Sequence, residues 1–327
     1  MSTLSLTFAN SPGTVTLPIA GSGLAVSIDW ENNGTTNTSL THNYSGTGPY
    51  IAVITVSSGT VTRFGYSNGS AWPGADKLTE VATNDTSTWG LPGVSSFLGA
   101  FYGCSALTVV PTQIPSSVTS LEFMFVNAYV FNQNIRNWDV SSVTNMWGMF
   151  YSQYNPTAFN QPIGSWDVSN VTTMTYMFQN CSAFNQDIGN WDVANVTGMR
   201  DMFNGAAAFN QDIRYWDTTS VTDFFRMFNG ATAMNTAYSA SIGWGTSPNY
   251  TPASTFFNQF SDNGVTYYFT EDSNNDVTIT GAVSSTGSPA TIADITIPGS
   301  FTVAGVVHTI RHIGSSAFYN NLSLIHI

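Results

Sequence analysis

The sequence predicts a mixed α/β fold in which a right-handed solenoid follows an all-β sandwich. Residues 93–245 repeat a pattern of about 25 residues, and a fixed period of this size is typical of stacked units that share one core. Residues 1–66 lack the repeat and contain Thr- and Val-rich runs separated by Gly, Asn and Ser. Short strands joined by turns have this pattern, which predicts the sandwich.

The first half of each repeat unit is predicted to be a short helix. Each unit opens with a valine: Val94, Val118, Val143, Val171, Val196 and Val221. The apolar positions of one unit fall on one helical face: Val196, Met199, Met202 and Phe203. Preferred N-cap residues precede five of the valines: Ser117, Ser142, Asn170, Asn195 and Ser220. Ten positions after the cap come residues that mostly tolerate the left-handed conformation at a helix end: Gly103, Asn127, Ser152, Asn180, Gly205 and Gly230.

The second half of each unit must return the chain to the next helix start. We expect a short parallel strand around residues 188–193, paired with its neighbours at about 4.8 Å through right-handed crossovers. The sequence thus predicts about six coils over 93–245. Residues 67–92 are interpreted as a connector, and 246–327 as a β-rich linker that begins a second, truncated repeat region.

The motif "FNQDIGNWDV" followed by "NVTGMRDMF" resembles the repeat of BspA-like leucine-rich-repeat surface proteins, and "HTIRHIGSSAFYNN" (308–321) is similar to a variant of that repeat. The stretch "VSIDWENNGTTNTSLTHNYSGTGPYIAVITV" resembles a polycystic-kidney-disease-type (PKD) immunoglobulin-like domain. The resemblance implies a leucine-rich-repeat-like solenoid after an immunoglobulin-like sandwich. It also implies an extracellular or cell-surface protein that takes part in adhesion.

Composition and charge limit the kinds of partner that the chain is expected to bind. The net charge is −12 and Lys77 is the only lysine, so nucleic acid is not an expected partner. No apolar run approaches the roughly 18 residues of a membrane span, and no signal peptide is visible after Met1. We interpret 322–327, "LSLIHI", as a sequencing-adapter artefact and expect the gene to continue.

We call the residues at equivalent positions of successive repeat units a column. Two columns are predicted to be structural ladders, in which each residue contacts its equivalent in the next unit. An exposed aromatic stripe could stack on sugars, but we interpret the tryptophans as a core ladder, because stacked repeats need a continuous core. The asparagines are expected to bond successive backbones. The ladder residues are Trp138, Trp166, Trp191, Trp216, Trp244, Asn132, Asn160, Asn185 and Asn210.

The acidic column is expected to bond turn amides, with ligand contact on the flank as an alternative. Its members are Asp139, Asp167, Asp192 and Asp217. Calcium at Asp187, Asp192, Asp212 and Asp217 is a further alternative, although Asn134 and Pro162 interrupt a regular site. Cys104 and Cys181 lie three coils apart, about 14 Å at the strand spacing, so we predict two free thiols.

Enzymatic chemistry has little support in the sequence. No histidine lies near a credible nucleophile or metal motif, and no phosphate-binding loop is present. We therefore expect no cofactor and no catalytic residue. The leading hypothesis is a surface or secreted protein that binds a protein or glycan on a host or neighbouring cell. A structural phage tail or virion protein is the alternative, and an enzyme is third.

Overall fold

The computed structural model describes residues 2–9, 13–66, 70–85 and 87–238, together with Pro252, Phe257 and the backbone of five strands between residues 259 and 313. The predictions for Trp244 and for residues 322–327 lie outside the described residues. So does most of the variant repeat motif, since the last described strand ends at Ile313.

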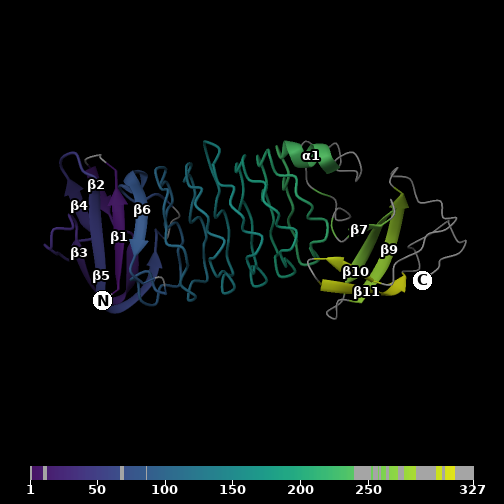
Figure 1. Cartoon of the computed structure of the whole chain (residues 1–327), viewed down its shortest axis with the longest axis horizontal. Helices are drawn as coiled ribbons and strands as arrows, with labels where there is room; N and C mark the ends of the chain where they lie inside the picture. The colour runs from purple at the N-terminus through teal and green to yellow at the C-terminus, as the bar shows by residue number, and fades with distance from the viewer. Residues whose placement is uncertain are drawn as a thin grey trace, which may run out of the picture.

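The N-terminal part consists of two antiparallel sheets (Figure 1). The first has four strands in the order β3-β5-β1-β6: β3 (Ile19–Asp29), β5 (Tyr50–Phe64), β1 (Thr3–Phe8) and β6 (Leu78–Thr83). The second pairs β2 (Gly13–Thr16) with β4 (Thr41–Tyr44). The alternate residues of β1, Leu4, Leu6 and Phe8, are buried, as expected for a strand with one face on a core. The sheet includes β6, which follows the short 3-10 helix η1 (Ala75–Lys77) within the segment interpreted as a connector.

The predicted mixed α/β, leucine-rich-repeat-like solenoid is wrong. Between residues 87 and 231 the chain contains no helix, and its only β pairing there consists of isolated single-residue bridges. The one α-helix in the described residues is α1 (Thr232–Tyr238). Regular strands are confined to the sheets at the two ends of the chain, and nearly all of their pairings are antiparallel.

The predicted helices do not form because alternate amides bond to the next repeat instead of to the same turn. The N–H groups of Met199, Asp201 and Phe203 donate to carbonyls one repeat later, each over 2.9 Å. Asp201 also has φ 53°, a left-handed value that breaks a right-handed helix. The predicted caps act differently too, since Asn195 Nδ2 donates to Ser169 O of the preceding repeat over 2.7 Å. The left-handed conformation is confirmed at five of the six predicted positions, where it ends a turn: Gly103, Asn127, Asn180, Gly205 and Gly230.

Equivalent residues of successive units nevertheless lie side by side. We call residues 93–231 the repeat region. Isolated parallel bridges join one residue of each unit to its equivalent in the next: Ser96, Ser120, Asn145, Thr173, Gly198 and Asp223. The repeat units lie next to one another between the N-terminal sheets and α1 (Figure 1). Each repeat unit is too small to bury its own apolar residues, so the neighbouring units complete its core.

The core of the repeat region contains two columns of stacked phenylalanines. Neighbouring rings of the first column lie 5.6 to 5.8 Å apart: Phe125, Phe150, Phe178, Phe203 and Phe228. Neighbouring rings of the second lie 5.9 to 6.2 Å apart: Phe131, Phe159, Phe184 and Phe209. Offset or stacked aromatic pairs of this kind stabilise a core beyond their buried area.

The N-terminal sheet continues directly into the first repeat. Arg63 of β5 forms a parallel bridge with Ser96, and Val81 N of β6 donates to Val109 O over 2.9 Å. Trp72 is buried and its Nε1 donates to Ala100 O over 2.9 Å. The C-terminal part of β5, which extends beyond its pairing with β1, and the edge strand β6 are therefore paired with the first repeat instead of being left open.

The C-terminal part forms a five-stranded sheet in the order β10-β11-β9-β8-β7. Its strands are β7 (Gln259–Asp262), β8 (Val265–Glu271), β9 (Asp276–Ser284), β10 (Ser300–Val303) and β11 (Val306–Ile313). Neighbours pair antiparallel except β9 and β11, which are parallel.

Candidate binding surfaces of the repeat region

The tryptophan column lies in the core and is tied to the backbone. Trp138, Trp166, Trp191 and Trp216 are buried, with at most 4% of each side chain's surface exposed. Each indole Nε1 donates to a carbonyl of the preceding repeat; for Trp191 the acceptor is Ile163 O, at 3.2 Å. These rings therefore present no face on which a ligand could stack.

The asparagine column links successive repeats on the flank. Asn160 Oδ1 accepts hydrogen bonds from Asn185 N over 3.0 Å and from Gln186 Nε2 over 2.8 Å. Asn132 and Asn185 accept from the next repeat in the same way. Asn132 and Asn210 are exposed, while Asn160 and Asn185 are half-buried. This column is therefore engaged by the chain itself.

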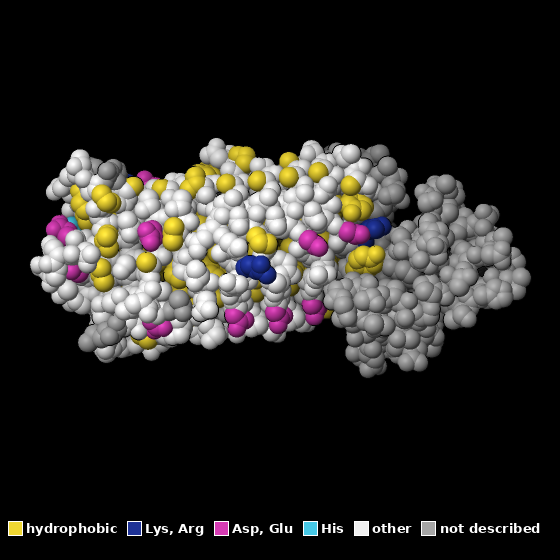
Figure 2. Space-filling view, in the orientation of Figure 1, with side chains coloured by type: hydrophobic (Ala, Val, Ile, Leu, Met, Phe, Trp, Pro, Cys, Tyr) yellow, Lys and Arg dark blue, Asp and Glu magenta, His cyan; other side chains and the backbone are white. Residues whose placement is uncertain are grey.

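The acidic column bonds the turn that follows it. Asp139 Oδ1 accepts from Ser141 N and Ser141 Oγ, and the hydroxyl bond is 2.6 Å long. Asp167, Asp192 and Asp217 accept the corresponding turn amides. Figure 2 shows acidic side chains in a row along one edge of the repeats. Within the described residues, no group of three or more His, Cys, Asp or Glu side chains could hold a metal ion, and Asp212 is paired with Arg214.

Both cysteines are free thiols in the core. Burial raises the pKa of Cys181 to about 12 and raises that of Cys104 well above its ordinary value. Neither is a thiolate at neutral pH, so neither is suited to nucleophilic chemistry.

Two neighbouring columns on another side of the repeat vary strongly from unit to unit. The fourth residue after the opening valine is Leu98, Glu122, Trp147, Thr175, Arg200 or Phe225. The fifth is Gly99, Phe123, Gly148, Tyr176, Asp201 or Arg226. The core columns beside them keep Val, Met and Phe. A constant core beside a partly exposed face that changes from unit to unit is the expected arrangement for a binding face on stacked repeats.

The central part of this face is an aromatic strip, which we define as Phe123, Trp147, Tyr151 and Tyr176. Trp147 lies 5.2 Å from Phe123 and 6.5 Å from Tyr176, and Tyr151 lies 6.0 Å from Tyr176, between ring centroids. Trp147 is 37% exposed and the nearby Tyr154 is 78% exposed. Phe123, Tyr151 and Tyr176 are half-buried beside Trp147. Aromatic rings grouped at a surface in this way mark interaction sites.

The backbone beneath this face adopts a conformation that large side chains rarely take. Every residue of the fifth column has φ between 53° and 62°, including Phe123 and Tyr176. An L-residue pays about 1 kcal/mol or more to hold this left-handed conformation. Gly148 takes it without strain, and a Cβ there would lie 2.7 Å from the Phe123 ring, so the missing side chain makes room for that ring.

The pKa values of two groups at the aromatic strip are raised by their surroundings. Burial, together with Tyr176, Tyr154 and Asp201, raises the pKa of Tyr151, so its hydroxyl stays protonated and can donate a hydrogen bond. Burial also raises the pKa of the adjacent Glu122, against the opposing effect of a 2.9 Å hydrogen bond from Asn145 Nδ2. The strip itself therefore offers ring faces and protonated hydroxyl groups.

Two ion pairs between arginine and aspartate lie on the part of this face that is nearest to α1. Arg226 Nε lies 2.8 Å from Asp201 Oδ1, and Asp201 is fully buried. Arg200 Nε lies 2.8 Å from Asp223 Oδ2. Both guanidinium groups lie over the Phe225 ring, at 4.5 Å for Arg200 and 5.3 Å for Arg226. These cations are satisfied within the chain.

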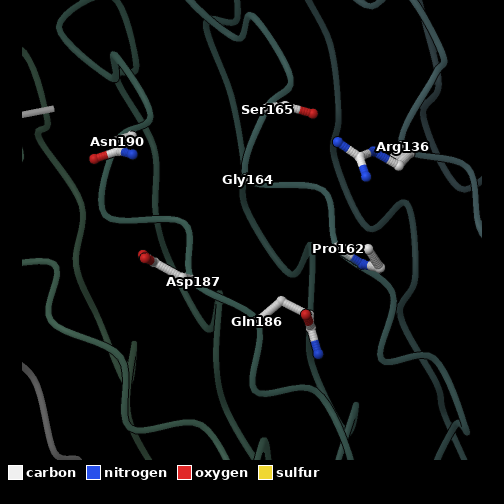
Figure 3. Close-up of a pocket in the computed structure, with 7 residues that line it drawn as sticks. All are labelled: Arg136, Pro162, Gly164, Ser165, Gln186, Asp187 and Asn190. Carbon is white, nitrogen blue, oxygen red and sulfur yellow. The ribbon is translucent and has the colours of Figure 1, made fainter. Parts of the chain in front are cut away.

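A separate shallow pocket of about 360 Å³ lies on the second half of the repeats (Figure 3). Arg136 and Pro162 line one side, and Asp187 and Asn190 line the other. The Arg136 guanidinium and the Ser165 hydroxyl point toward one another. Most of the lining residues are polar, the pocket surface is part polar and part apolar, and the pocket is open to solvent. None of the residues of the aromatic strip lines it.

Sequence reasoning missed both surfaces because it followed the columns that stay constant. The signal for the aromatic strip was present in the fifth column, where glycine alternates with large side chains. The signal for the pocket was a position where arginine alternates with glycine: Arg136, Gly164, Gly189 and Arg214. In both cases the informative feature is variation between units of one chain.

Comparison with known families assigns the repeats. Residues 75–157, 96–192 and 151–265 each match the family described as Mycoplasma protein of unknown function, DUF285, and together they cover more than half of the chain. This repeat family is related to BspA-like surface proteins, whereas neither a leucine-rich-repeat nor a PKD family is identified. No curated protein and no solved structure matches the chain. The chain therefore belongs to the DUF285 repeat family.

Proposed function

We propose that this chain is a non-enzymatic adhesion or interaction protein that binds a protein or glycan on a host or neighbouring cell through the repeat region. The observation that carries this proposal is the aromatic strip, with Trp147 exposed between Phe123 and Tyr176. Its rings lie on a face that differs from unit to unit, whereas the core columns beneath it are nearly uniform. A fixed frame with an adaptable face suits recognition better than catalysis.

The strained backbone under the strip supports a role in recognition. Phe123 and Tyr176 occupy left-handed positions where glycine would cost less, and Gly99 and Gly148 show that glycine is compatible with the frame. Strained residues that stability alone does not require are often retained at functional sites. We infer that the side chains are kept for what they contact outside the chain.

The chemistry of the strip suits sugar rings or an uncharged protein surface. Aromatic faces bind the apolar faces of sugars and large apolar side chains, and tyrosine hydroxyls add directional hydrogen bonds. The relation of the family to BspA-like surface proteins supports the proposal of a surface location. The helices in the described part of the chain are all too short or too polar to cross a bilayer.

The proposal can be tested on a panel of immobilised host matrix proteins and glycans. The whole chain and a Trp147→Ala variant are compared at equal concentration, with circular dichroism to confirm that both are folded. We expect the whole chain to bind a subset of the panel and the variant to lose at least tenfold in affinity. Absence of binding across the panel, or equal binding by the variant, would contradict the proposal. Ordered self-assembly without ligand binding would favour the structural virion alternative.

A further inference from the structure

Two arginines occupy the same position of the repeat in very different surroundings. Arg214 makes a two-point pair with Asp212, two residues earlier, through Nε to Oδ1 at 2.9 Å and a second amine to Oδ2 at 2.8 Å. Arg136 has Asn134 at the corresponding place. In the part of the chain that the structure describes, the Arg136 guanidinium makes no ion pair and no hydrogen bond.

The contrast shows what this position binds. At Arg214 the chain supplies a carboxylate, and arginine holds it through two parallel bonds, the geometry for which its planar fork is suited. At Arg136 no described carboxylate lies within ion-pair distance, and Asp187, the carboxylate in the pocket lining, is on the opposite side. The equivalent positions of the next two units are Gly164 and Gly189, so neither unit places a side chain from this position beside the guanidinium. A Cβ at Gly164 would lie 2.2 Å from Asp187 O, so the backbone packs tightly there and leaves the pocket open.

We propose that the pocket beside Arg136 binds an acidic sugar, whose carboxylate takes the place that Asp212 occupies beside Arg214. The remaining lining suits hydroxyl groups. Ser165 and Asn190 can donate or accept, and Asp187 uses its carboxylate for one backbone amide, Gly189 N at 3.0 Å, which leaves acceptor capacity for sugar hydroxyls. Pro162 provides one apolar contact.

A sugar matches this lining better than a peptide. A peptide would bring apolar side chains, and Pro162 is the one apolar residue in the lining. The apolar part of the pocket surface is interspersed with polar groups, which suits the mixed C–H and hydroxyl surface of a sugar. The overall charge of −12 disfavours long polyanions, but charges beyond about 8 Å are screened at physiological ionic strength. One carboxylate beside the Arg136 guanidinium is therefore compatible with an acidic protein, provided that it binds on the Arg136 side of the pocket, away from Asp187.

The test uses two probes that differ in one group, methyl glucuronide and methyl glucoside. Binding to the whole chain is measured by chemical-shift titration. We expect the glucuronide to bind at least tenfold more tightly than the glucoside, and Arg136→Gln to abolish that difference. Equal affinity for the two probes, or an unchanged preference in the variant, would overturn the proposal. So would equal competition by a small peptide that carries a single C-terminal carboxylate.

A second variant separates recognition from folding. Asn134→Asp places a carboxylate two residues before Arg136, as Asp212 stands before Arg214. We expect this carboxylate to pair with Arg136 and to remove the preference for the glucuronide, while the fold is retained. Ser116→Asp, at an exposed position on the preceding repeat, changes the net charge equally and should leave the preference intact. Full glucuronide preference in Asn134→Asp would contradict the proposal. The test is independent of the aromatic strip, since Trp147→Ala should leave glucuronide binding unchanged even if panel binding is lost.

Discussion

The side-chain oxygen of Asn160 lies 3.0 Å from the backbone nitrogen of Asn185 in the next repeat, and it also accepts from Gln186 Nε2 at 2.8 Å. Asn160→Ala removes the acceptor for both donors. We expect the free energy of unfolding to fall by about 1–2 kcal/mol, because half-buried donors are left unpaired. Urea denaturation followed by circular dichroism measures the change.

Asn210 is the matched control for Asn160. Its backbone N–H donates to Asn185 Oδ1, and alanine keeps that bond. Its own side-chain oxygen accepts only a 3.5 Å contact from the neighbouring Gln211. Asn210→Ala should therefore cost well under half as much as Asn160→Ala, and equal losses would show that the cross-repeat bonds are not the cause.

The two ion pairs on the variable face should differ in energy because their burial differs. Arg226→Ala leaves Asp201, which is fully buried, without its cation and should cost about 2 kcal/mol. Arg200→Ala leaves Asp223, whose side chain is 41% exposed, and should cost less than about 1 kcal/mol. Thermal and urea unfolding of the two variants would measure this difference. A larger loss in Arg200→Ala would refute the burial argument.

Asp139 should ionise at a lower pH than an ordinary aspartate. The hydroxyl and the amide of Ser141 hold its pKa below 3.8. Its contribution to stability is complete above pH 3.8 and is lost as the pH falls through the lower pKa of the folded state. An NMR titration of the Asp139 carboxyl carbon should show a midpoint below 3.8, and Ser141→Ala should move it upward. An unmoved midpoint would argue against the hydroxyl bond as the main cause.

The sequence revealed what repeats but not the backbone that the repeats adopt. The spacing of Val196, Met199 and Phe203 is compatible with a helical face, and all three are buried. However, the amides of Met199 and Phe203 donate to carbonyls of the next repeat instead of closing a helical turn. Single-chain periodicity reports which side chains face inward, and a helix and a tight cross-linked turn can share that pattern. The decisive feature, the left-handed backbone at Tyr176 and Asp201, violates a local preference, so no propensity argument could predict it.

The candidate sites could not be predicted from the sequence, for a related reason. Trp147 becomes part of a surface only because Phe123 and Tyr176 lie one repeat to either side. Arg136 is informative only beside the space left by Gly164. Both relations depend on how the turns are stacked.

Replacing Tyr176 by glycine should not destabilise the fold as an aromatic truncation usually does. Glycine adopts φ 60° without strain, so the substitution relieves the folded state of a strain of about 1 kcal/mol. The backbone bond from residue 176 N to Arg200 O, at 2.9 Å, is kept. We expect Tyr176→Gly to stay within about 1 kcal/mol of the parent in urea denaturation. A loss of 3 kcal/mol or more, typical of core aromatic truncation, would show that the ring is structural.

The same variant gives the most direct test of the claim that the aromatic strip is the binding surface. The dissociation constant of Tyr176→Gly for a panel ligand of the whole chain is compared with that of Asp192→Asn, a change outside the strip. If the strip binds the ligand, Tyr176→Gly weakens binding at least tenfold, about 1.4 kcal/mol, and Asp192→Asn does not. Unchanged affinity in a stable Tyr176→Gly protein, or an equal loss in Asp192→Asn, would contradict the account.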